Sequence, residues 1–342
     1  MRLLFLAWLS PKTGNCTTAE RIRDHIESAG HTCVLRDTRE FSSPSDVATL
    51  LTKESFEGAL AIHLFKGGRL LLDVKVPFGV IFGGTDINED VKDEHKRCVM
   101  TQVLRRARFA VAFTDKLKEA AEAFLASQSS KIYVQPQGIE TKVAADFSWS
   151  EFLRSSGVHG QHIEDLRVFL LVCGLRRVKD PLYLLRAFSE WHSQNPPVVL
   201  VIIGPTIDPV FSREVEESIR SSVGVFLASE RDQEELHAVM QRSFALVNSS
   251  ISEGMSAAIL EAMDLGVPVL ARNIPGNAAI VKHEVTGLLY SSPEEFICQA
   301  KRLLNDAELL ATVTRNGKHY IKEHHDSAGE RRTYQQLVTM LF

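Results

Sequence analysis

The chain has 342 residues, which at about 150 residues per domain suggests two domains of ordinary size. It is 44% hydrophobic, 8% aromatic and 24% charged, a globular composition that excludes disordered, collagen-like and small disulfide-stapled proteins. The net charge of −4 arises from mixed charges of both signs, so we expect neither a nucleic-acid partner nor an anionic membrane surface as partner.

The first predicted element is an apolar run over residues 3–9 that follows Met1 and Arg2. It resembles the apolar region of a signal peptide, which would make the protein secreted. The run is short, ends at Ser10 and Pro11, and lacks a clear small-x-small cleavage site, so we interpret it as a buried first strand. No apolar run reaches the roughly 18 residues of a membrane-spanning helix, and we expect no transmembrane segment.

In the first half of the chain, short apolar runs alternate with longer amphipathic stretches. Strands are predicted at residues 2–9, 32–36, 58–64, 77–82, 108–113 and 131–134, and helices at 17–29, 45–55, 88–106 and 115–126. Apolar strands that alternate with helices are typical of a parallel sheet covered on both faces. Residues 1–148 are therefore predicted to form a Rossmann-like domain.

The periodic pattern stops near residue 141, and residues 149–166 are predicted to be a linker region. It resumes over residues 167–321, with strands expected at 168–173, 198–203, 224–227, 245–247 and 267–270. Residues 322–342 are expected to include a terminal helix that packs back on the first domain. Two such halves predict an α/β protein of two doubly wound domains that face across a cleft, where the carboxyl ends of strands gather ligands.

The most informative segment is residues 252–270. Ser256 is expected to cap a helix that is apolar almost all round and therefore buried, with Gly266 and Pro268 ending it. Burying Glu261 in this helix is costly unless groups donate hydrogen bonds to it, and the hydroxyls of a sugar or a ribose are such donors. The alternative is that Glu261 pairs with a buried arginine or lysine.

The residues before this helix can meet an anion. Glu253 and Gly254 precede its first turn, where backbone N–H groups have no acceptor within the helix. The alternative is that Glu253 only interacts favourably with the helix dipole. The segment thus offers amides for a phosphate and two carboxylates for hydroxyls.

A second segment, residues 173–181, follows a predicted strand. Asp180 is expected to cap a helix with Pro181 at its first position, which leaves Lys179 outside a helix end that disfavours cations. A bound diphosphate would remove this conflict, since cations and a helix end together stabilise such a leaving group. The alternative is a solvated basic loop.

Together these segments resemble the glycosyltransferase family 4, also called glycosyl transferases group 1. Glu253 and Glu261 match the family's E-x7-E signature, and residues 272–277 and 284–290 resemble the continuation of its C-terminal domain. The likeness spans nearly the whole chain and is strongest over residues 168–305. It implies the GT-B fold and a retaining transfer of sugar from a nucleoside diphosphate sugar, with a UDP-sugar as the expected donor.

The resemblance also implies roles for individual residues. Glu261 would hold the ribose hydroxyls, Glu253 the donor sugar, and Lys179 with Arg176 the diphosphate. The remaining donor-binding residues are expected to be glycines of strand-end loops and residues at the helix start: Gly14, Gly174, Gly204, Gly254, Met255, Ser256 and Ala257.

The chain departs from the family at two places. Leu175 directly follows Gly174, with one residue fewer than usual before Lys179. Residues 83–88 resemble the H-G-x-D-x-N element, but Gly83 stands at its histidine position. His63, at the end of another predicted strand, is a candidate to supply a catalytic imidazole instead, and the alternative is a hydrogen-bonded core histidine.

No cofactor or metal is expected beyond the nucleotide sugar as co-substrate. The five cysteines, Cys16, Cys33, Cys98, Cys173 and Cys298, are odd in number and widely spaced, which argues against disulfides and zinc and favours a cytoplasmic protein. The sequence contains neither G-x-G-x-x-G nor a P-loop, which disfavours a nicotinamide dehydrogenase and a P-loop nucleotidase. Two alternatives to a transferase remain, a sugar-nucleotide epimerase and a nucleotide-sugar-binding protein without catalysis.

Overall fold

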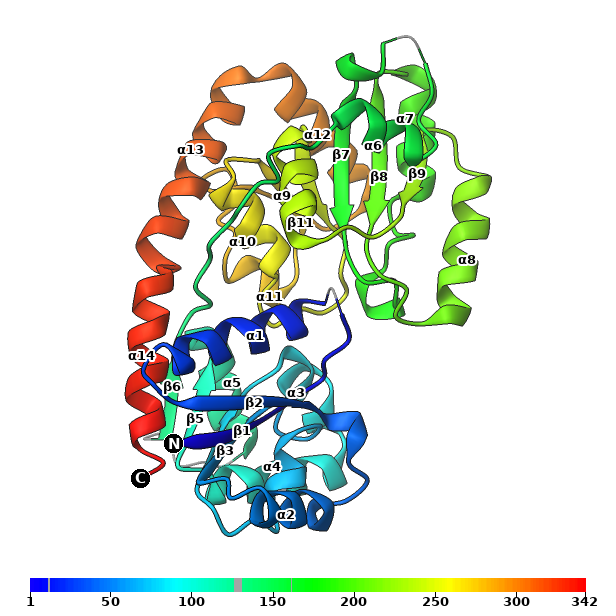
Figure 1. The fold of residues 1–342 in the computed structure, drawn as a ribbon. Coiled ribbons are helices and arrows are strands. Elements are labelled where there is room, and N and C mark those ends of the chain that lie inside the picture. The colour runs from blue at the N-terminus through cyan, green and yellow to red at the C-terminus, as the bar shows by residue number, and fades with distance from the viewer. Residues whose placement is uncertain (12, 126–130, 161) are drawn as a thin grey trace. The chain divides into compact units, whose positions relative to one another are not determined.

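The computed structural model describes residues 1–11, 13–125, 131–160 and 162–342. Lys12, expected in a loop, and residue 126, expected at a helix end, lie outside the described residues. The chain divides into two compact units (Figure 1): residues 1–138 with 325–342, and residues 139–324. Each unit holds a six-stranded sheet whose paired strands all run parallel.

The first unit has its sheet in the order β2-β1-β3-β4-β5-β6. The strands are β1 Arg2–Ala7, β2 Thr32–Asp37, β3 Gly58–Ile62, β4 Phe78–Ile81, β5 Phe109–Ala112 and β6 Ile132–Val134. The α-helices are α1 Gly14–Glu27, α2 Pro44–Lys53, α3 Gly84–Asn88, α4 Glu94–Arg106, α5 Asp115–Leu125 and α14 Ser327–Thr339, with short 3-10 turns η1 Thr38–Glu40, η2 Gly68–Leu71 and η3 Asp90–Lys92. All the predicted strands are present, with slightly different ends.

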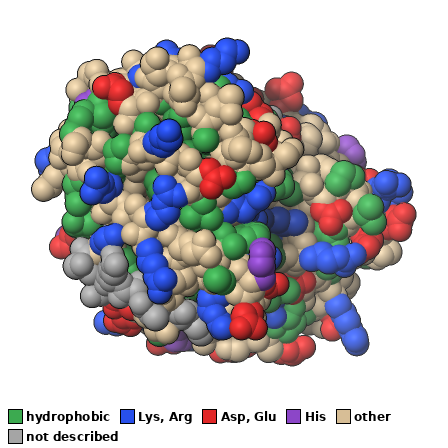
Figure 2. Space-filling model, turned by 90° about the horizontal axis from the view of Figure 1, so that it is seen from below, with side chains coloured by type: hydrophobic (Ala, Val, Ile, Leu, Met, Phe, Trp, Pro, Cys, Tyr) green, Lys and Arg blue, Asp and Glu red, His purple; other side chains and the backbone are tan. Residues whose placement is uncertain are grey.

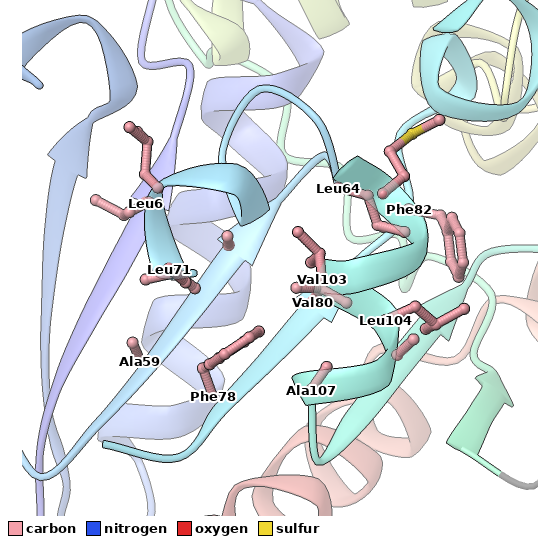
Figure 3. Packing of buried hydrophobic residues seen from close by; sticks show 14 of the residues in the cluster. Leu6, Ala59, Leu64, Leu71, Phe78, Val80, Phe82, Val103, Leu104 and Ala107 are labelled. Carbon is pink, nitrogen blue, oxygen red and sulfur yellow. The ribbon is translucent and has the colours of Figure 1, made fainter. Parts of the chain in front are cut away.

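The core of this unit follows from the two-residue period of its strands. Every second residue of β1 and of β3, such as Leu6 and Ala59, belongs to one apolar cluster together with Leu71 of η2 and Val103 of α4 (Figure 3). Helix α2 also contributes to this cluster. The predicted helix 88–106 proved to be shorter, because Asp93 accepts a hydrogen bond from the amide of Lys96 and begins α4 there.

The C-terminal helix α14 packs beside α1 in the first unit. Glu330 on α14 is completely buried, and it accepts hydrogen bonds from Arg21 at 2.8 and 3.2 Å. The Nε2 atom of His25 lies 3.0 Å from the same carboxylate. This buried cluster of charged side chains attaches α14, the last helix of the chain, to α1 of the first unit.

The second unit has its sheet in the order β12-β11-β10-β7-β8-β9. The strands are β7 Arg167–Val172, β8 Val198–Ile203, β9 Val225–Ala228, β10 Ala245–Asn248, β11 Val269–Arg272 and β12 Leu288–Tyr290. The helices are α6 Trp149–Ser155, α7 Leu185–Gln194, α8 Pro209–Arg220, α9 Gln233–Arg242, α10 Ala257–Asp264, α11 Pro275–Ala278, α12 Pro293–Asn305 and α13 Ala307–His324, with η5 Ile163–Asp165 and η6 Arg177–Lys179.

Both faces of the second sheet are buried. Val168 and Leu170 belong to one apolar cluster, whereas Phe169 and Leu171 belong to another, as the alternation of side chains along a strand requires. Helices α9 and α10 contribute to the first cluster, and α7, α8 and α12 contribute to the second. The sheet is therefore covered on both sides, as the near-continuous apolar strands indicate.

The region 149–166 is expected to be a linker, and its described residues, 149–160 and 162–166, belong to the second unit. Residue 161 lies outside the described residues. The region contains α6, whose Trp149, Phe152 and Leu153 are buried in the core of that unit. The chain passes from the first unit to the second after Gly138 and returns after His324. The expected terminal helix, residues 322–342, comprises the end of α13 and the whole of α14.

The surface carries both charge signs. On the face drawn in Figure 2, Lys and Arg side chains are scattered among Asp and Glu side chains. Within the described ranges, no helix is both long enough and apolar enough to cross a membrane.

Candidate functional site

The second sheet has a topological switch point between β7 and β10. The chain adds β8 and β9 on one side of β7 and then returns to place β10 on its other side. In open α/β sheets, ligands bind outside the carboxyl ends of the two strands at such a switch point. The segment 173–180 follows β7, and the segment 249–256 follows β10. These are the two segments from which the sequence predicts a diphosphate site and a sugar site.

The ion pair between Lys179 and Glu253 joins the two segments. Lys179 Nζ lies 2.5 Å from Glu253 Oε1, and the side chains are only 18% and 9% exposed. Ser250 Oγ and Asn248 Nδ2 donate to the same oxygen at 2.8 and 3.3 Å. Burial opposes ionisation of Glu253, but the Lys179 ammonium and these hydrogen bonds lower its pKa. The site therefore contains a partly buried carboxylate that is ionised at neutral pH.

Two buried asparagines hold the loop that carries Glu253 by hydrogen bonds. Asn248, at the end of β10, is 6% exposed, and its Oδ1 accepts from the amide of Ser250 at 3.1 Å and from Asn277 Nδ2 at 2.9 Å. Asn277, on α11, is fully buried and also donates to the carbonyl of Arg272 at 3.0 Å. No motif in the sequence marks either residue as part of the site, although Asn248 lies directly after a predicted strand.

The segment 173–180 differs from the expectation at Asp180. Asp180 has left-handed backbone angles and ends η6, and α7 begins only at Leu185, so its predicted role as the cap of that helix is wrong. Its carboxylate instead pairs with Arg272, with 2.9 Å between Asp180 Oδ2 and Arg272 Nη1. The Arg272 guanidinium lies over the Tyr183 ring, with Cζ 3.8 Å from the ring centre. Lys179 is held by Glu253 rather than solvated.

The other basic residues of this segment are exposed. Arg177 pairs with Glu214 at 2.7 Å. Arg176 is exposed, and no ion pair joins it to another residue of the described ranges. Its side chain can therefore reach a ligand without breaking an existing pair.

Helix α10 begins beside Glu253. Ser256 is its N-cap, as predicted, but the Ser256 side chain makes no capping bond, and its Oγ lies 3.4 Å from Asn248 Nδ2. The N–H groups of the first turn, beginning at Ala257, have no acceptor within the helix. Gly254 and Met255 lie between Glu253 and this turn and are partly exposed. The helix start thus has the geometry of an anion site.

Glycines allow the strand-end loops to approach one another. A Cβ on Gly204 would lie 1.9 Å from the carbonyl oxygen of Cys173, and one on Gly174 would lie 2.8 Å from Ile207. A Cβ on Gly276 would lie 2.1 Å from the carbonyl oxygen of Glu253. The loops after β7 and β8 are therefore closely packed against each other, and the start of α11 is closely packed against the segment that carries Glu253.

Glu261 lies on α10 with its side chain 12% exposed. Its Oε1 accepts from Gln233 Nε2 at 3.0 Å, and its Oε2 lies 3.8 Å from His237 Nε2. The described residues supply no arginine or lysine partner for Glu261, so the alternative of a buried pair with such a residue does not hold. Burial opposes protonation of His237, but its hydrogen bond and attraction to Glu261 raise the His237 pKa.

In the first unit, His63 follows β3 at the carboxyl edge of the sheet. Its backbone is left-handed, with φ 68°, and its side chain is 12% exposed. Thr85 Oγ1 lies 3.1 Å and Asp86 Oδ2 lies 3.6 Å from His63 Nδ1. A Cβ on Gly83 would lie 1.9 Å from Cε1 of His63, so the imidazole fills the space that a side chain at Gly83 would occupy.

Asp86 holds this imidazole in place. It is fully buried and accepts from the amides of Leu64 at 2.8 Å and Gly83 at 2.9 Å. Burial opposes ionisation of Asp86, but attraction to His63 and these hydrogen bonds lower its pKa.

Gly14, at the first position of α1, is exposed, and a Cβ there would meet nothing within 4 Å.

The structure thus brings Lys179 and Glu253 into direct contact beside the start of α10, with Glu261 about one turn along that helix. His63 and Gly14 belong to the other unit. Across the described ranges, no group of three or more His, Cys, Asp or Glu side chains has a metal-binding arrangement.

Comparison with solved structures identifies the fold. The crystal structure of Anabaena Alr3699/HepE in complex with UDP-glucose matches with a TM-score of 0.79 at 16% identity, over 99% of each chain. Sucrose-phosphate synthase from Thermosynechococcus elongatus matches with a TM-score of 0.80 at 15% identity, over 100% of this chain and 99% of the other. The two parallel six-stranded sheets therefore define a protein of the GT-B class.

Sequence comparison identifies the family. The model of glycosyl transferases group 1 matches residues 159–320. A protein from Xenopus tropicalis named glycosyltransferase 1 domain-containing protein 1 is 54% identical over 341 residues, covering 100% of this chain and 98% of its own length. The chain belongs to the family of glycosyl transferases group 1.

Proposed function

We propose that this protein is a retaining glycosyltransferase that moves a sugar from a nucleoside diphosphate sugar to an acceptor hydroxyl. The observation that carries this proposal is the pair of carboxylates at the switch point of the second sheet. Glu253 is ionised beside the start of α10, and Glu261 has Gln233 and His237 as partners but no arginine or lysine in the described chain. Family membership supports a transferase rather than an epimerase, and retention rests on the family resemblance.

The donor is held as follows in this proposal. The ribose hydroxyls donate to Glu261, whose carboxylate Gln233 and His237 orient. The diphosphate lies against Lys179, Arg176 and the amides of about Met255–Ala257, and the donor sugar hydroxyls donate to Glu253. The neighbour HepE, whose structure contains UDP-glucose, supports a UDP-sugar as the donor.

The leaving diphosphate is stabilised by cations and helix N–H groups in place of a metal ion. Charge-assisted hydrogen bonds from Lys179 and Arg176 strengthen as negative charge develops on the leaving oxygen, which is the general basis of electrostatic catalysis. Transfer should therefore persist in EDTA. Complete loss of transfer that added Mg²⁺ restores would contradict a metal-independent mechanism.

His63 supplies a catalytic imidazole from the first unit. Its ring fills the space at Gly83, where the family's histidine-bearing element has glycine in this chain, and Asp86 and Thr85 hold its Nδ1. His63→Asn should lower kcat and leave the Kd for UDP unchanged. The double variant His63→Gly with Gly83→His returns the imidazole to the β4 loop and should recover part of the activity. A single variant with wild-type kcat would exclude a catalytic role.

The test of donor binding is a thermal-shift comparison of UDP, GDP, ADP and their sugar conjugates. A ligand at 100 times its Kd adds about 2.7 kcal/mol to the free energy of unfolding. Glu261→Ala should weaken binding of the matching nucleotide by roughly ten- to a hundredfold, since each charge-assisted hydrogen bond contributes about 1.5–3 kcal/mol.

The control is Glu190→Ala, which removes an exposed carboxylate from α7 of the same unit. It should bind the nucleotide like the wild type. If Glu261→Ala also binds normally, the ribose assignment is wrong. Consumption of the nucleotide sugar with an acceptor distinguishes a transferase from an epimerase, which would rearrange the sugar without consuming it, and from a binding protein, which would do neither.

A further inference from the structure

The first sheet also has a switch point, between β1 and β3. The chain runs from β1 outward to β2 and then returns to β3 on the other side of β1. Segments after the two strands therefore diverge at the carboxyl edge, which is where open α/β sheets bind ligands. Trp8 follows β1, and His63 and Lys66 follow β3. No residue of the donor site proposed in the second unit belongs to this edge.

Trp8 is an exposed aromatic side chain held in a fixed position. It is 36% exposed, whereas the other two tryptophans, Trp149 and Trp191, are 6% and 3% exposed. Its Nε1 donates to Ser10 Oγ at 2.5 Å, and its carbonyl accepts from Asn15 Nδ2 at 3.2 Å. A large ring fixed at the water-facing edge of a sheet is suited to contact a ligand.

Two cations lie close to this ring. The Cζ atom of Arg39, in the turn after β2, and the Nζ atom of Lys66 lie 5.1 and 5.5 Å from the centre of the Trp8 ring. Arg39 is paired with Asp37 at 2.6 Å. Lys66 has no carboxylate partner among the described residues, so its charge is not compensated.

The same segment carries a second uncompensated cation. Arg69 lies 5.9 Å from the centre of the Phe65 ring and has no ion-pair partner within the part of the chain that the structure describes. Lys96, 5.2 Å from the same ring, pairs with Asp90 at 2.7 Å and adds no net charge. We call Trp8, Lys66 and Arg69 the Trp8 platform, an aromatic surface with two unpaired positive charges.

We propose that the Trp8 platform binds the acceptor, and that the acceptor is a sugar bearing an anionic group, a phosphate or a carboxylate. This inference rests on the proposed transferase function, because it assigns the substrate of that reaction. The apolar C–H face of a pyranose ring packs on the negatively polarised face of an indole. The anionic group pairs with Lys66, and Arg69 adds attraction over a longer range. A neutral sugar would satisfy the ring but leave both cations unpaired.

Three sugars with the same ring test this chemistry: glucose, glucose 6-phosphate and glucuronate. Their binding to the 342-residue chain is followed by tryptophan fluorescence in the presence of the quencher acrylamide. Quenching reports mainly on Trp8, since the other two tryptophans are buried. At least one anionic sugar should protect Trp8 from quenching at about tenfold lower concentration than glucose, and added salt should reduce the difference. The stronger anionic probe identifies phosphate or carboxylate as the group.

The decisive variant is Lys66→Gln, with Lys75→Gln as control. Lys75 is an exposed lysine of the same unit, so both variants change the net charge equally. Lys66→Gln should weaken anionic-sugar binding by about tenfold and leave glucose unaffected, and Lys75→Gln should change neither. The proposal is overturned if the anionic sugars bind no better than glucose, if none binds, or if the two variants behave alike.

The nucleotide thermal shift on the same samples separates this inference from the proposed function. If UDP stabilises the protein and anionic sugars show no preference, the acceptor class is wrong and the donor site stands. If anionic sugars protect Trp8 but no nucleotide binds, the Trp8 platform remains an anionic-sugar site, and its role as the acceptor site of a transferase is refuted.

Discussion

Lys179 and Glu253 each provide the other's counter-charge in the second unit, which gives the first prediction. Lys179→Met leaves the carboxylate of Glu253, 9% exposed, without its cation. Removing one partner of a buried ion pair typically costs about 3–5 kcal/mol, so we expect a loss near the lower end, because Lys179 is 18% exposed. Urea denaturation followed by circular dichroism measures this loss.

Two further variants control this measurement. Arg186→Gln breaks the exposed pair with Glu190 and should change the free energy of unfolding by less than about 0.5 kcal/mol. The double variant Lys179→Met with Glu253→Gln removes both charges and should recover much of the lost stability. If Lys179→Met is as stable as Arg186→Gln, the ion pair does not stabilise the site.

His237 gives a prediction of pH dependence. Its pKa is raised above its ordinary value of 6.5, because Glu261 stabilises the imidazolium against the effect of burial. The resulting stability is fully present below the ordinary pKa and is lost as the pH rises through the raised pKa of the folded state. Glu261→Gln removes the charge, so the His237 pKa should fall. Proton NMR titration of the histidine rings, assigned with His237→Gln, measures both values. An unchanged pKa in Glu261→Gln would contradict the coupling.

At the residue scale, sequence patterns predict the carboxylates but not their surroundings. Glu253 and Glu261 are conspicuous because charged residues flank or interrupt an apolar helix. Asn248 and Gln233 are not conspicuous, because polar residues at a strand end and in a first helical turn are common. Their contact with the site depends on how β10 and α9 pack beside α10, and no local spacing encodes that packing.

At the element scale, the position of the loop that carries Glu253 depends on Gly276 of α11. A Cβ in Gly276→Ala would lie 2.1 Å from the carbonyl oxygen of Glu253, which is backbone and cannot rotate away. We expect a loss of roughly 1–3 kcal/mol, typical of overpacking, together with weaker UDP binding. Denaturation and calorimetric titration measure the two effects.

Gly14→Ala is the matched control for this prediction. Its Cβ would meet nothing within 4 Å, and alanine favours a helix more than glycine does, so the free energy of unfolding should not fall. If Gly276→Ala is as stable as Gly14→Ala, the close approach of α11 to the loop does not constrain the site.

The elements of the chain differ in how well their sequences predict them. Buried parallel strands such as β8 are long apolar runs with no competing interpretation. Helix α6 lies in the segment predicted to be a linker, although Trp149, Phe152 and Leu153 have the i, i+3, i+4 spacing of a buried helix face and Ser148 caps the helix. The Asp180–Pro181 signal indicated a helix start, but the ion pair with Arg272 holds Asp180 in a left-handed turn. A tertiary contact overrides the local signal there.

At the scale of the whole molecule, the chain crosses between its two units twice, after Gly138 and after His324. Both crossing points are anchored in the first unit, because His325 Nδ1 lies 2.8 Å from the carbonyl oxygen of Gln137. Arg21 Nη2 donates to the Gln137 side chain at 3.3 Å and to Glu330 at 3.2 Å. A single buried cluster thus connects α1, α14 and the chain that leaves the unit.

Glu330→Gln should therefore destabilise the first unit selectively. Burial opposes ionisation of Glu330, but His25 and Arg21 lower its pKa, so its contribution to stability is present above its ordinary pKa of 4.5 and is lost as the pH falls through the depressed value. At neutral pH, the variant leaves Arg21 and His25 without their carboxylate.

Hydrogen exchange followed by mass spectrometry should show faster exchange in peptides of α1 and α14 and unchanged exchange in α10, because local openings follow the cooperative unit that is weakened. Glu323→Gln, which removes an exposed carboxylate on α13, should change none of these peptides. Equal acceleration in α10 would instead mean that the two units unfold as one cooperative body and that the buried cluster stabilises the whole chain.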